Sequence, residues 1–405
     1  MRSLHQRSKI WLPLLSVTAA ISLGYSRISF AQQLVPGDIL SADAVAPCAP
    51  TQHSACGQLY VINRQSGSTT RQVFHPEKGP LGSNVEGITY VPGTLASAPT
   101  ILMVDGNGGT GQRGSLTQID PTTGTRQVLS DFGVGDSKTL GLYPIAVYAR
   151  PLLSLLGLGL LPPTDYWVVD AMAGTNNLGA LFSVRRTDNS RRLVSDFGDT
   201  SQGPLGAYPN SIVARTSLLG ALLDNYLYMT DASAGTNTHG AIFKVNTIDG
   251  TRQLVADLGQ PVGTCPVDPS PLSGPVAIAV APLGVTNVGK LYVLNSNAGR
   301  LGKGVLLEIN PDSQPVSCKV VHDFSDDANS IPPLAAGFQP GALEWELNGS
   351  GTPTNKLLVQ DGDGGTNHLG ILVEVDSTSG ATTILNDFGV GAPQGYLPIG
   401  LAVVR

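Results

Sequence analysis

The chain has 405 residues, of which 41% are hydrophobic and 13% are charged, and its formal net charge is −6. This composition provides enough apolar side chains for a large core and no basic face, which argues against a nucleic-acid partner. The 49 glycines and 29 prolines are typical of a chain with many short strands and turns.

The N-terminus has the pattern of a secretory signal peptide. A basic start that includes Arg2 and Lys9 precedes the apolar stretch 10–23, and small residues at 29 and 31 precede a cleavage point before Gln32. The apolar stretch is short for a membrane span, and an uncleaved anchor is the alternative. We therefore predict a signal peptide over 1–31 and a periplasmic or extracellular mature chain, 32–405.

The four cysteines are Cys48, Cys56, Cys265 and Cys318. An even number in an exported chain favours disulfides, although three pairings are open. We prefer Cys48–Cys56 because it closes a short loop, which leaves Cys265–Cys318 as the second pair. The spacing fits no zinc pattern.

A ten-residue motif, D-x-x-x-G-T-N-x-x-G, organises the rest of the chain. Its copies begin at Asp105, Asp170, Asp231 and Asp361, with a degenerate copy at Asn295. Six closing glycines define six units of roughly sixty residues each. They are Gly57, Gly114, Gly179, Gly240, Gly304 and Gly370.

Each unit holds four short apolar segments bounded by Gly, Pro, Asn or Asp, as in 84–91, 100–104, 115–119 and 126–130. The third and fourth segments flank a turn in which a glycine such as Gly124 supplies a positive φ. No stretch has a sustained helical period. The sequence therefore predicts an all-β, six-bladed β-propeller over 32–405, with four antiparallel strands per blade.

The two ends of the chain predict how the ring closes. The first unit begins at 37–41 with what we expect to be a second strand, so its innermost strand is missing. The C-terminal stretch 396–404 resembles the innermost strands of other units. We predict that it enters the first blade and closes the ring, which removes the exposed edge that an open array would leave.

The two faces of the predicted ring differ in composition. The motif loops and the loops that follow Asp-Phe-Gly share one face, where we expect the function to lie. On the opposite face, the loops 151–163 and 216–223 are almost wholly apolar. These loops either form a patch for self-association or membrane contact, or fold over each other and cap the channel.

The repeated aspartates end a strand at a glycine-rich turn, where a carboxylate accepts hydrogen bonds from turn N–H groups. We therefore expect them to be structural, together with the later set Asp131, Asp196, Asp257, Asp323 and Asp387. One copy, with Asp361 and Asp363 at alternate positions, resembles a calcium loop. Met172 and Ser233 occupy the third position in other copies, so no common calcium site exists.

Residues that depart from the repeat are candidates for function. Glu86 and Asn210 open innermost strands and are expected at the channel mouth, where they would hold a divalent ion or position a water. Tyr143, Tyr208 and Tyr396 flank innermost strands and would supply an aromatic wall for a planar ligand; packing between blades is the alternative.

Three of the six histidines, His53, His239 and His368, lie in loops of the same face. Imidazoles that converge from different blades would bind a transition metal or act as acid–base groups. Solvated loop histidines are the alternative.

In its expected fold and repeat, the chain resembles six-bladed propellers of the NHL-repeat and SMP-30/gluconolactonase-like kind. The latter resemblance implies a channel metal held by Glu, Asn and Asp, for which Glu86 and Asn210 stand in plausible places and no Asp is evident. The repeat, followed by GALFSV and RRLVSDFGD, also looks like the exported NHL-type proteins of the cyanobacterial gene cluster for scytonemin, an indole–phenol pigment. That resemblance implies a role in late pigment assembly, such as oxidative coupling.

Two functions are therefore expected. The first is an exported enzyme that acts on a small aromatic metabolite at the channel mouth, with Glu86, His239 and His368 as catalytic groups. Its cofactor would be a divalent metal, either calcium or a transition metal, with Glu86, Asn210, Asp361 and Asp363 as ligands. The second is a non-enzymatic scaffold that binds a protein or a glycan through the loop face.

Overall fold

The structure is a computed structural model, and the residues it describes all lie in the compact unit Gln32–Arg405. It describes residues 33–405 except 45–46, 50–51, 56, 65–69, 79–80, 83, 150–151, 156–157, 216–224, 263–264, 266–273, 330–339 and 392. The predicted signal peptide therefore lies outside the described residues. No helix in the described part of the chain is long and apolar enough to cross a membrane.

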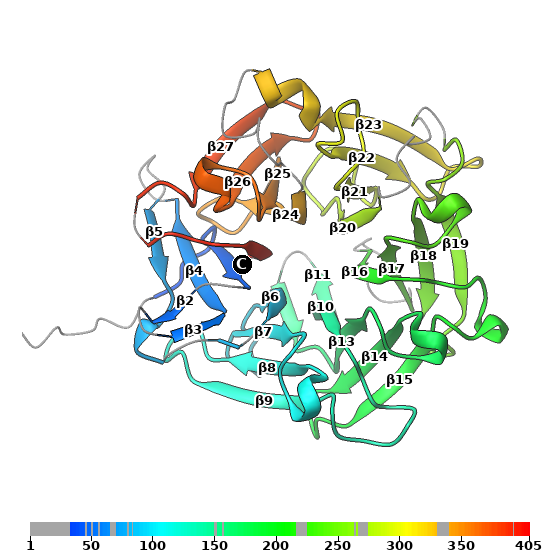
Figure 1. Cartoon of the computed structure of the whole chain (residues 1–405), viewed down its shortest axis with the longest axis horizontal. Helices are drawn as coiled ribbons and strands as arrows, with labels where there is room; N and C mark the ends of the chain where they lie inside the picture. The colour runs from blue at the N-terminus through cyan, green and yellow to red at the C-terminus, as the bar shows by residue number, and fades with distance from the viewer. Residues whose placement is uncertain are drawn as a thin grey trace, which may run out of the picture. The chain divides into compact units, whose positions relative to one another are not determined.

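Six four-stranded antiparallel sheets are arranged in a ring within this unit, as Figure 1 shows. This arrangement confirms the predicted all-β, six-bladed propeller. From the innermost strand outward, blade 1 contains β28 (Pro398–Val403), β1 (Ile39–Asp43), β4 (Gln58–Asn63) and β5 (Thr70–Val73). Blade 2 contains β6 (Val85–Val91), β7 (Thr100–Asp105), β8 (Ser115–Ile119) and β9 (Arg126–Asp131).

The remaining blades follow the same order. Blade 3 contains β10 (Pro144–Ala149), β13 (Asp165–Asp170), β14 (Ala180–Arg185) and β15 (Arg191–Asp196). Blade 4 contains β16 (Pro209–Ala214), β17 (Tyr226–Asp231), β18 (Ala241–Asn246) and β19 (Arg252–Asp257). Blade 5 contains β20 (Pro275–Val280), β21 (Leu291–Asn295), β22 (Val305–Asn310) and β23 (Ser317–Asp323). Blade 6 contains β24 (Pro340–Leu347), β25 (Pro353–Asp361), β26 (Ile371–Asp376) and β27 (Thr382–Asp387).

The C-terminal strand closes the ring. β28 pairs with β1 from Ile39 opposite Val403 to Asp43 opposite Pro398, so the last strand of the chain is the innermost strand of the first blade. In Figure 1 the red end of the chain lies beside the blue strands of blade 1. The predicted closure is confirmed, and it leaves the array without an unpaired end strand.

Local sequence explains the strands and their turns. Successive side chains of a strand point to opposite faces of its sheet, and both faces of a blade are buried against neighbouring blades, so the middle strands are nearly continuous apolar runs. β7 and β13 are examples, and the apolar residues of blades 2 and 3 form one shared core cluster. Hairpin turns between third and fourth strands carry Gly124, Gly250 and Gly380 with φ of 65°, 75° and 74°, as predicted.

Arginines at the start of outermost strands hold neighbouring blades together. Arg191 of blade 3 reaches back to the loop after β9, where its guanidinium donates to the carbonyls of Asp131, Val134 and Thr139. It also lies over the ring of Phe132, 4.5 Å from the ring centroid. A guanidinium presents five donors in a fixed fork, which suits it to several carbonyls at once.

The same clamp recurs at two other junctions. Arg252 of blade 4 donates to the carbonyls of Pro204, Asp196 and Asp199 and lies 4.9 Å from the ring centroid of Phe197. Arg71 of blade 1 clamps blade 6 in this way; its partners are Pro393, Asn386, Asp387, Phe388 and Val390. We call these contacts the arginine clamps.

The disulfide prediction is confirmed for one pair, Cys265–Cys318. The side chains of the other predicted pair, Cys48 and Cys56, lie outside the described residues. Of the apolar loops on the opposite face, β11 (Leu152–Leu155) and β12 (Leu158–Leu161) pair as a hairpin, and 216–223 lies outside the described residues. The self-association or membrane-contact surface stays a prediction.

Candidate functional site at the channel mouth

Each of the six innermost strands begins with a β-bulge, and we call this ring of bulge residues the channel mouth. The second residue of each innermost strand is skipped in the pairing with the next strand: Val85 pairs with Asp105 and Gly87 with Val104, which leaves Glu86 as the bulge. The six bulge residues are Glu86, Ile145, Asn210, Val276, Gly341 and Ile399. A bulge turns a side chain out of the regular pleat. The residue type at this position can therefore differ from blade to blade. Four of its six members are apolar or glycine, and Glu86 and Asn210 are the polar members.

Glu86 is held by two neighbours. The amide Nδ2 of Asn84 donates to Glu86 Oε1 over 2.6 Å and to the Tyr143 hydroxyl over 2.7 Å. The Tyr143 hydroxyl donates in turn to the same Oε1. The three side chains thus form a closed hydrogen-bonded triangle between blades 2 and 3. It occupies Oε1 and leaves Oε2 without a partner among the described residues.

The environment of Glu86 raises its proton affinity. Burial raises the pKa of the Glu86 carboxyl above its ordinary value, and the hydrogen bonds from Tyr143 and Asn84 oppose that effect. Burial and the neighbouring Glu86 charge also raise the pKa of Tyr143, which keeps this phenol protonated and donating. A carboxyl with a raised pKa beside a channel mouth has the properties of a general acid or base.

Tyr208 completes this side of the mouth. Burial raises its pKa, and the charges of Glu86 and Asp170 add to the effect. Tyr143 and Tyr208 occupy the same place in their blades, directly before the first residue of the innermost strand, and Asn84 occupies it in blade 2. No hydrogen bond to the Tyr208 hydroxyl is found among the described residues, so this donor is available to a ligand.

Gly106 makes room for the Tyr143 ring. A Cβ at Gly106 would lie 2.8 Å from Cε2 of Tyr143, closer than real Cβ contacts allow. Gly106 follows the motif residue Asp105, and Ala171 and Ala232 occupy the equivalent place in blades 3 and 4. The glycine therefore permits an aromatic side chain of the next blade to pack down beside Glu86.

Asn210 is engaged inside the protein. Its Nδ2 donates to the carbonyl of Pro275 over 2.9 Å, and its Oδ1 accepts from the Thr230 hydroxyl over 2.7 Å. Asn210 is buried, and its contact with Pro275 ties blade 4 to blade 5, while Thr230 belongs to its own blade. The structure therefore places Asn210 in the predicted ring, with both ends of its amide already paired.

The other predicted site residues lie apart from this cluster. Tyr396 is 40% exposed, and its backbone N–H donates to Asp43. His239 is buried in the blade 4 motif loop, and its Nδ1 has no partner among the described residues. His368 is exposed in the blade 6 motif loop, with Nδ1 3.6 Å from Oδ1 of Asp363. The side chain of His53 lies outside the described residues.

The repeated aspartates accept hydrogen bonds from backbone N–H groups of the turns, as predicted. Asp170 accepts from the backbone N–H groups of Leu142, Tyr143, Met172 and Ala173. The later set acts alike, since Asp131 accepts from the backbone N–H and hydroxyl of Thr110. In Asp361, the carboxylate accepts from the N–H groups of Asp363 and Gly364. These contacts confirm a structural role for the motif.

The predicted metal ligands do not come together as one donor set. Glu86, Asn210 and the pair Asp361 and Asp363 belong to three different blades, and Asn210 and Asp361 are engaged in the hydrogen bonds given above. The described residues contain no group of three or more His, Cys, Asp or Glu side chains with metal-ligand spacing. The residues at the mouth do not fit the Glu, Asn and Asp set that the SMP-30 resemblance implies, and we derive no step through a metal.

Sequence reasoning missed two features. Asn84 became visible only through its contacts with Glu86 and Tyr143, although it precedes its strand as the tyrosines precede theirs. Two of the arginine clamps had a signal, because Arg191 and Arg252 each stand five residues before the Asp that ends their strand. That recurring offset would have identified them.

Comparisons with known proteins define the fold class. A chain in a crystal structure of a nidogen/laminin complex is similar, with a TM-score of 0.51, 14% identity, and coverage of 91% of this chain and 99% of that one. TolB from Acinetobacter baumannii is similar with a TM-score of 0.50 and 10% identity, over 90% of this chain and 66% of TolB. Identities this low show the fold alone, and together with the sheet topology they define a six-bladed β-propeller.

No protein-family model matches the sequence, and the search of curated proteins gave no match. The resemblance to NHL-repeat proteins and to the scytonemin cluster therefore has no support from sequence comparison. The propeller itself is shown, and its function rests on the site.

Proposed function

We propose that the channel mouth binds a small planar aromatic molecule carrying an N–H or O–H group, and that Glu86 accepts the hydrogen bond or the proton from that group. The observation that carries this proposal is the triangle of Asn84, Glu86 and Tyr143, which fixes one carboxylate oxygen and leaves the other for a ligand.

The surroundings of Glu86 favour an aromatic ligand. Tyr143 and Tyr208 offer ring faces, and the neighbouring bulge residue Ile145 offers an apolar contact. Sites for small molecules combine apolar walls with a few fixed polar groups, and aromatic rings prefer offset or edge contacts with one another. The Tyr208 hydroxyl would donate to a ligand oxygen, while Glu86 Oε2 would accept from a ligand donor.

Proton transfer follows from the same geometry. Because burial raises the pKa of Glu86, its carboxylate is a stronger base than an exposed one. Asn84 and Tyr143 would stay on Oε1 and hold the carboxyl orientation while Oε2 takes the ligand proton. We propose binding and proton transfer at this site. We also propose that the protein is exported and that its mature chain begins at Gln32.

Phenols and indoles have the required shape and donor. The resemblance to exported scytonemin proteins would make the natural ligand an indole–phenol monomer, and oxidative coupling would be a later step for which we derive no mechanism. A divalent metal stays an expectation from the SMP-30 resemblance.

The test is calorimetric titration of the mature chain with indole and with 4-hydroxyphenyl compounds. Gly341→Phe is the blocking variant, because no described atom lies within 4 Å of a Cβ at this position of the bulge ring and its φ is not positive. We expect Glu86→Gln to weaken binding about tenfold, as the loss of a charged hydrogen bond does, and Gly341→Phe to abolish it.

Arg185→Ala is the matched control, since Arg185 is exposed at the end of β14, away from the mouth. It should bind like the wild type. If neither compound binds, or if Gly341→Phe binds as well as the wild type, the mouth is not the site. The scaffold function, in which the loop face binds a protein or glycan, is then favoured.

A further inference from the structure

The junction between blades 4 and 5 differs from the arginine-clamped junctions at one register position. In blades 3 and 4 the clamp arginines Arg191 and Arg252 pair with Val184 and Val245 of the preceding strand. In blade 5 the residue at this position is Cys318, which pairs with Ile309. Like the arginines, Cys318 stands five residues before the aspartate that ends its strand. A cysteine thus replaces the clamp arginine.

The other half of the clamp is replaced as well. Arg191 and Arg252 lie over Phe132 and Phe197, which follow the last residue of the preceding blade. After β19 of blade 4 the corresponding residue is Leu258, which offers no ring face to a cation. At the two clamp positions, 318 and 258, the junction therefore has neither the guanidinium nor the aromatic ring.

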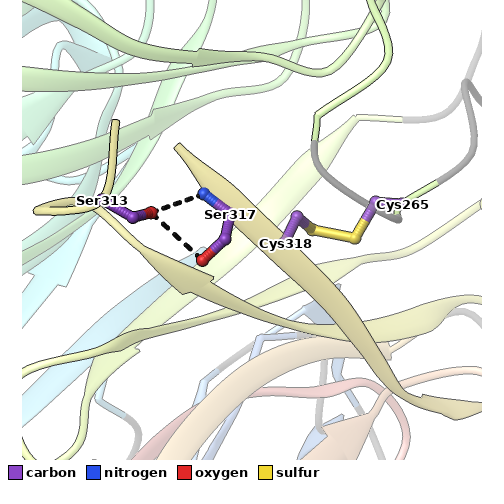
Figure 2. Close-up of a disulfide and its surroundings, with 4 residues drawn as sticks. All are labelled: Cys265, Ser313, Ser317 and Cys318. Carbon is purple, nitrogen blue, oxygen red and sulfur yellow. Dashed lines mark hydrogen bonds between the residues drawn. A yellow bond between two sulfur atoms is a disulfide. The ribbon is translucent and has the colours of Figure 1, made fainter. Parts of the chain in front are cut away.

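Cys265 lies in the segment to whose carbonyls an arginine at position 318 would donate. It follows β19, as the clamped carbonyls follow β9 and β15, and its N–H donates to the carbonyl of Val262. Figure 2 shows the disulfide joining this segment to Cys318 on β23. The two Cα atoms are 5.5 Å apart, and both cysteines are buried. On the other side of Cys318, Ser313 and Ser317 hydrogen-bond across the end of the hairpin.

We propose that the Cys265–Cys318 disulfide is a covalent substitute for the arginine clamp, and that it makes the blade 4/blade 5 junction a redox-sensitive latch of the ring. A dithiol opens the latch by two exchanges: one thiolate attacks a sulfur of the bond to give a mixed disulfide, and the second thiolate displaces it. The protein gains two electrons and two protons as two thiols, and the dithiol becomes a disulfide.

Reduction of the Cys265–Cys318 disulfide acts locally, at the blade 4/blade 5 junction. A cysteine thiol is too short and too weak a donor to replace a guanidinium that serves several carbonyls. Reduction would therefore leave the segment after β19 without its outer tie, while Arg71, Arg191 and Arg252 keep their contacts at other junctions.

The test is hydrogen exchange, read by mass spectrometry, on a mature chain with Cys48→Ser and Cys56→Ser, so that Cys265–Cys318 is the one disulfide the reagent can act on. With dithiothreitol we expect exchange in β19 and β23 to speed up about tenfold, while β9 and β15 keep their rates. The melting temperature should fall by roughly 5 °C or more. The proposal is overturned if exchange in β19 and β23 is unchanged on reduction, or if it rises equally around the ring.

A rescue variant separates the latch from a general effect of dithiothreitol. Cys265→Ser with Cys318→Arg and Leu258→Phe rebuilds the clamp of the neighbouring junction. We expect its exchange at β23 to approach that of the oxidised protein and not to respond to the dithiol. A rescue variant that exchanges as fast as reduced protein would contradict the substitution of one clamp for the other. If this variant does not fold, the comparison of reduced and oxidised protein decides alone.

Discussion

The outer rim, where the arginine clamps lie, and the channel mouth are built from the same repeat. Clamp residues recur between blades, whereas the residues at the mouth differ from blade to blade. At three junctions of the rim, equivalent residues make equivalent contacts: Arg71, Arg191 and Arg252 each clamp the preceding blade, and each lies against a phenylalanine. At the mouth, the equivalent bulge positions carry a carboxylate, an amide, aliphatic side chains and a glycine. Repetition marks what holds the ring together, and variation marks where we propose that a ligand is selected.

Burial explains this difference. A rim arginine satisfies several carbonyls that would otherwise be left unpaired, so any change is costly. A bulge residue is left out of the ladder pairing with the next strand, so the sheet itself places less restriction on its side chain. The mouth is therefore free to vary between blades.

The largest expected effect is the loss of stability when an arginine clamp at the rim is removed. Arg252→Ala removes a buried guanidinium that donates to three backbone carbonyls and the Ser195 hydroxyl. We expect the free energy of unfolding in urea to fall by about 3 kcal/mol, with ligand binding at the mouth retained in the folded fraction. Arg185→Ala, at an exposed site, should change it by less than about 0.5 kcal/mol. A loss below about 1 kcal/mol in Arg252→Ala would remove the distinction between the two regions.

A smaller effect is expected where the motif touches the mouth. Gly106→Ala places a methyl group against the Tyr143 ring, which has to move and so loosens its contact with Glu86. Overpacking of this kind costs about 1–2 kcal/mol of stability, and we expect binding of the aromatic ligand to weaken at least as much as in Glu86→Gln. Gly349→Ala is the control, because no described atom lies within 4 Å of a Cβ there. Unchanged binding in Gly106→Ala would show that the Tyr143 contact does not position Glu86.

The smallest effect is a pH dependence of stability. The pKa of Glu86 is raised in the folded protein, so the fold binds this proton more tightly than the unfolded chain does and loses stability as the group ionises. The melting temperature of Glu86→Gln, relative to the wild type, should therefore rise as pH increases from the ordinary value of 4.5 through the raised value, and then level off.

Asp120→Asn provides a control of opposite sign. Backbone N–H groups of Thr123 and Thr122 lower the pKa of Asp120, so its ionised form stabilises the fold, and that stability is lost as pH falls below the ordinary value toward the lowered one. A Glu86→Gln difference that is constant with pH, or that has the sign of Asp120→Asn, would contradict a buried charge at the mouth.

The fold was predictable because its determinants are local and repeated. Alternating apolar segments, a glycine with positive φ in each hairpin turn, and the aspartates that cap each motif specify one blade, and the repeat specifies the ring. The closure by 396–404 followed from the missing first strand. The Cys265–Cys318 pair was predicted by elimination, and the structural reason, its register with the clamp arginines, was not visible before the blades were aligned.

The site was predictable in part. Glu86 and Tyr143 stood out as departures from the repeat, and the structure brings them together. Asn210 lies at a bulge position equivalent to that of Glu86, but its amide contacts depend on Thr230 and Pro275 of other strands. His239, His368 and Tyr396 share a face with Glu86 and no contact with it, because a sequence pattern gives the face of a residue and not its distance from the channel axis.

The central claim is that ligands are selected at the mouth and not at the rim. Crystals of the mature chain soaked with a bromoindole test it most directly, since anomalous scattering locates bromine without reference to any assumed pose. We predict one strong peak within the ring of bulge residues, with the indole N–H toward Glu86 Oε2, and no such peak in Gly341→Phe. A bromine bound at the arginine clamps or on the opposite face, with the mouth empty, would contradict the account.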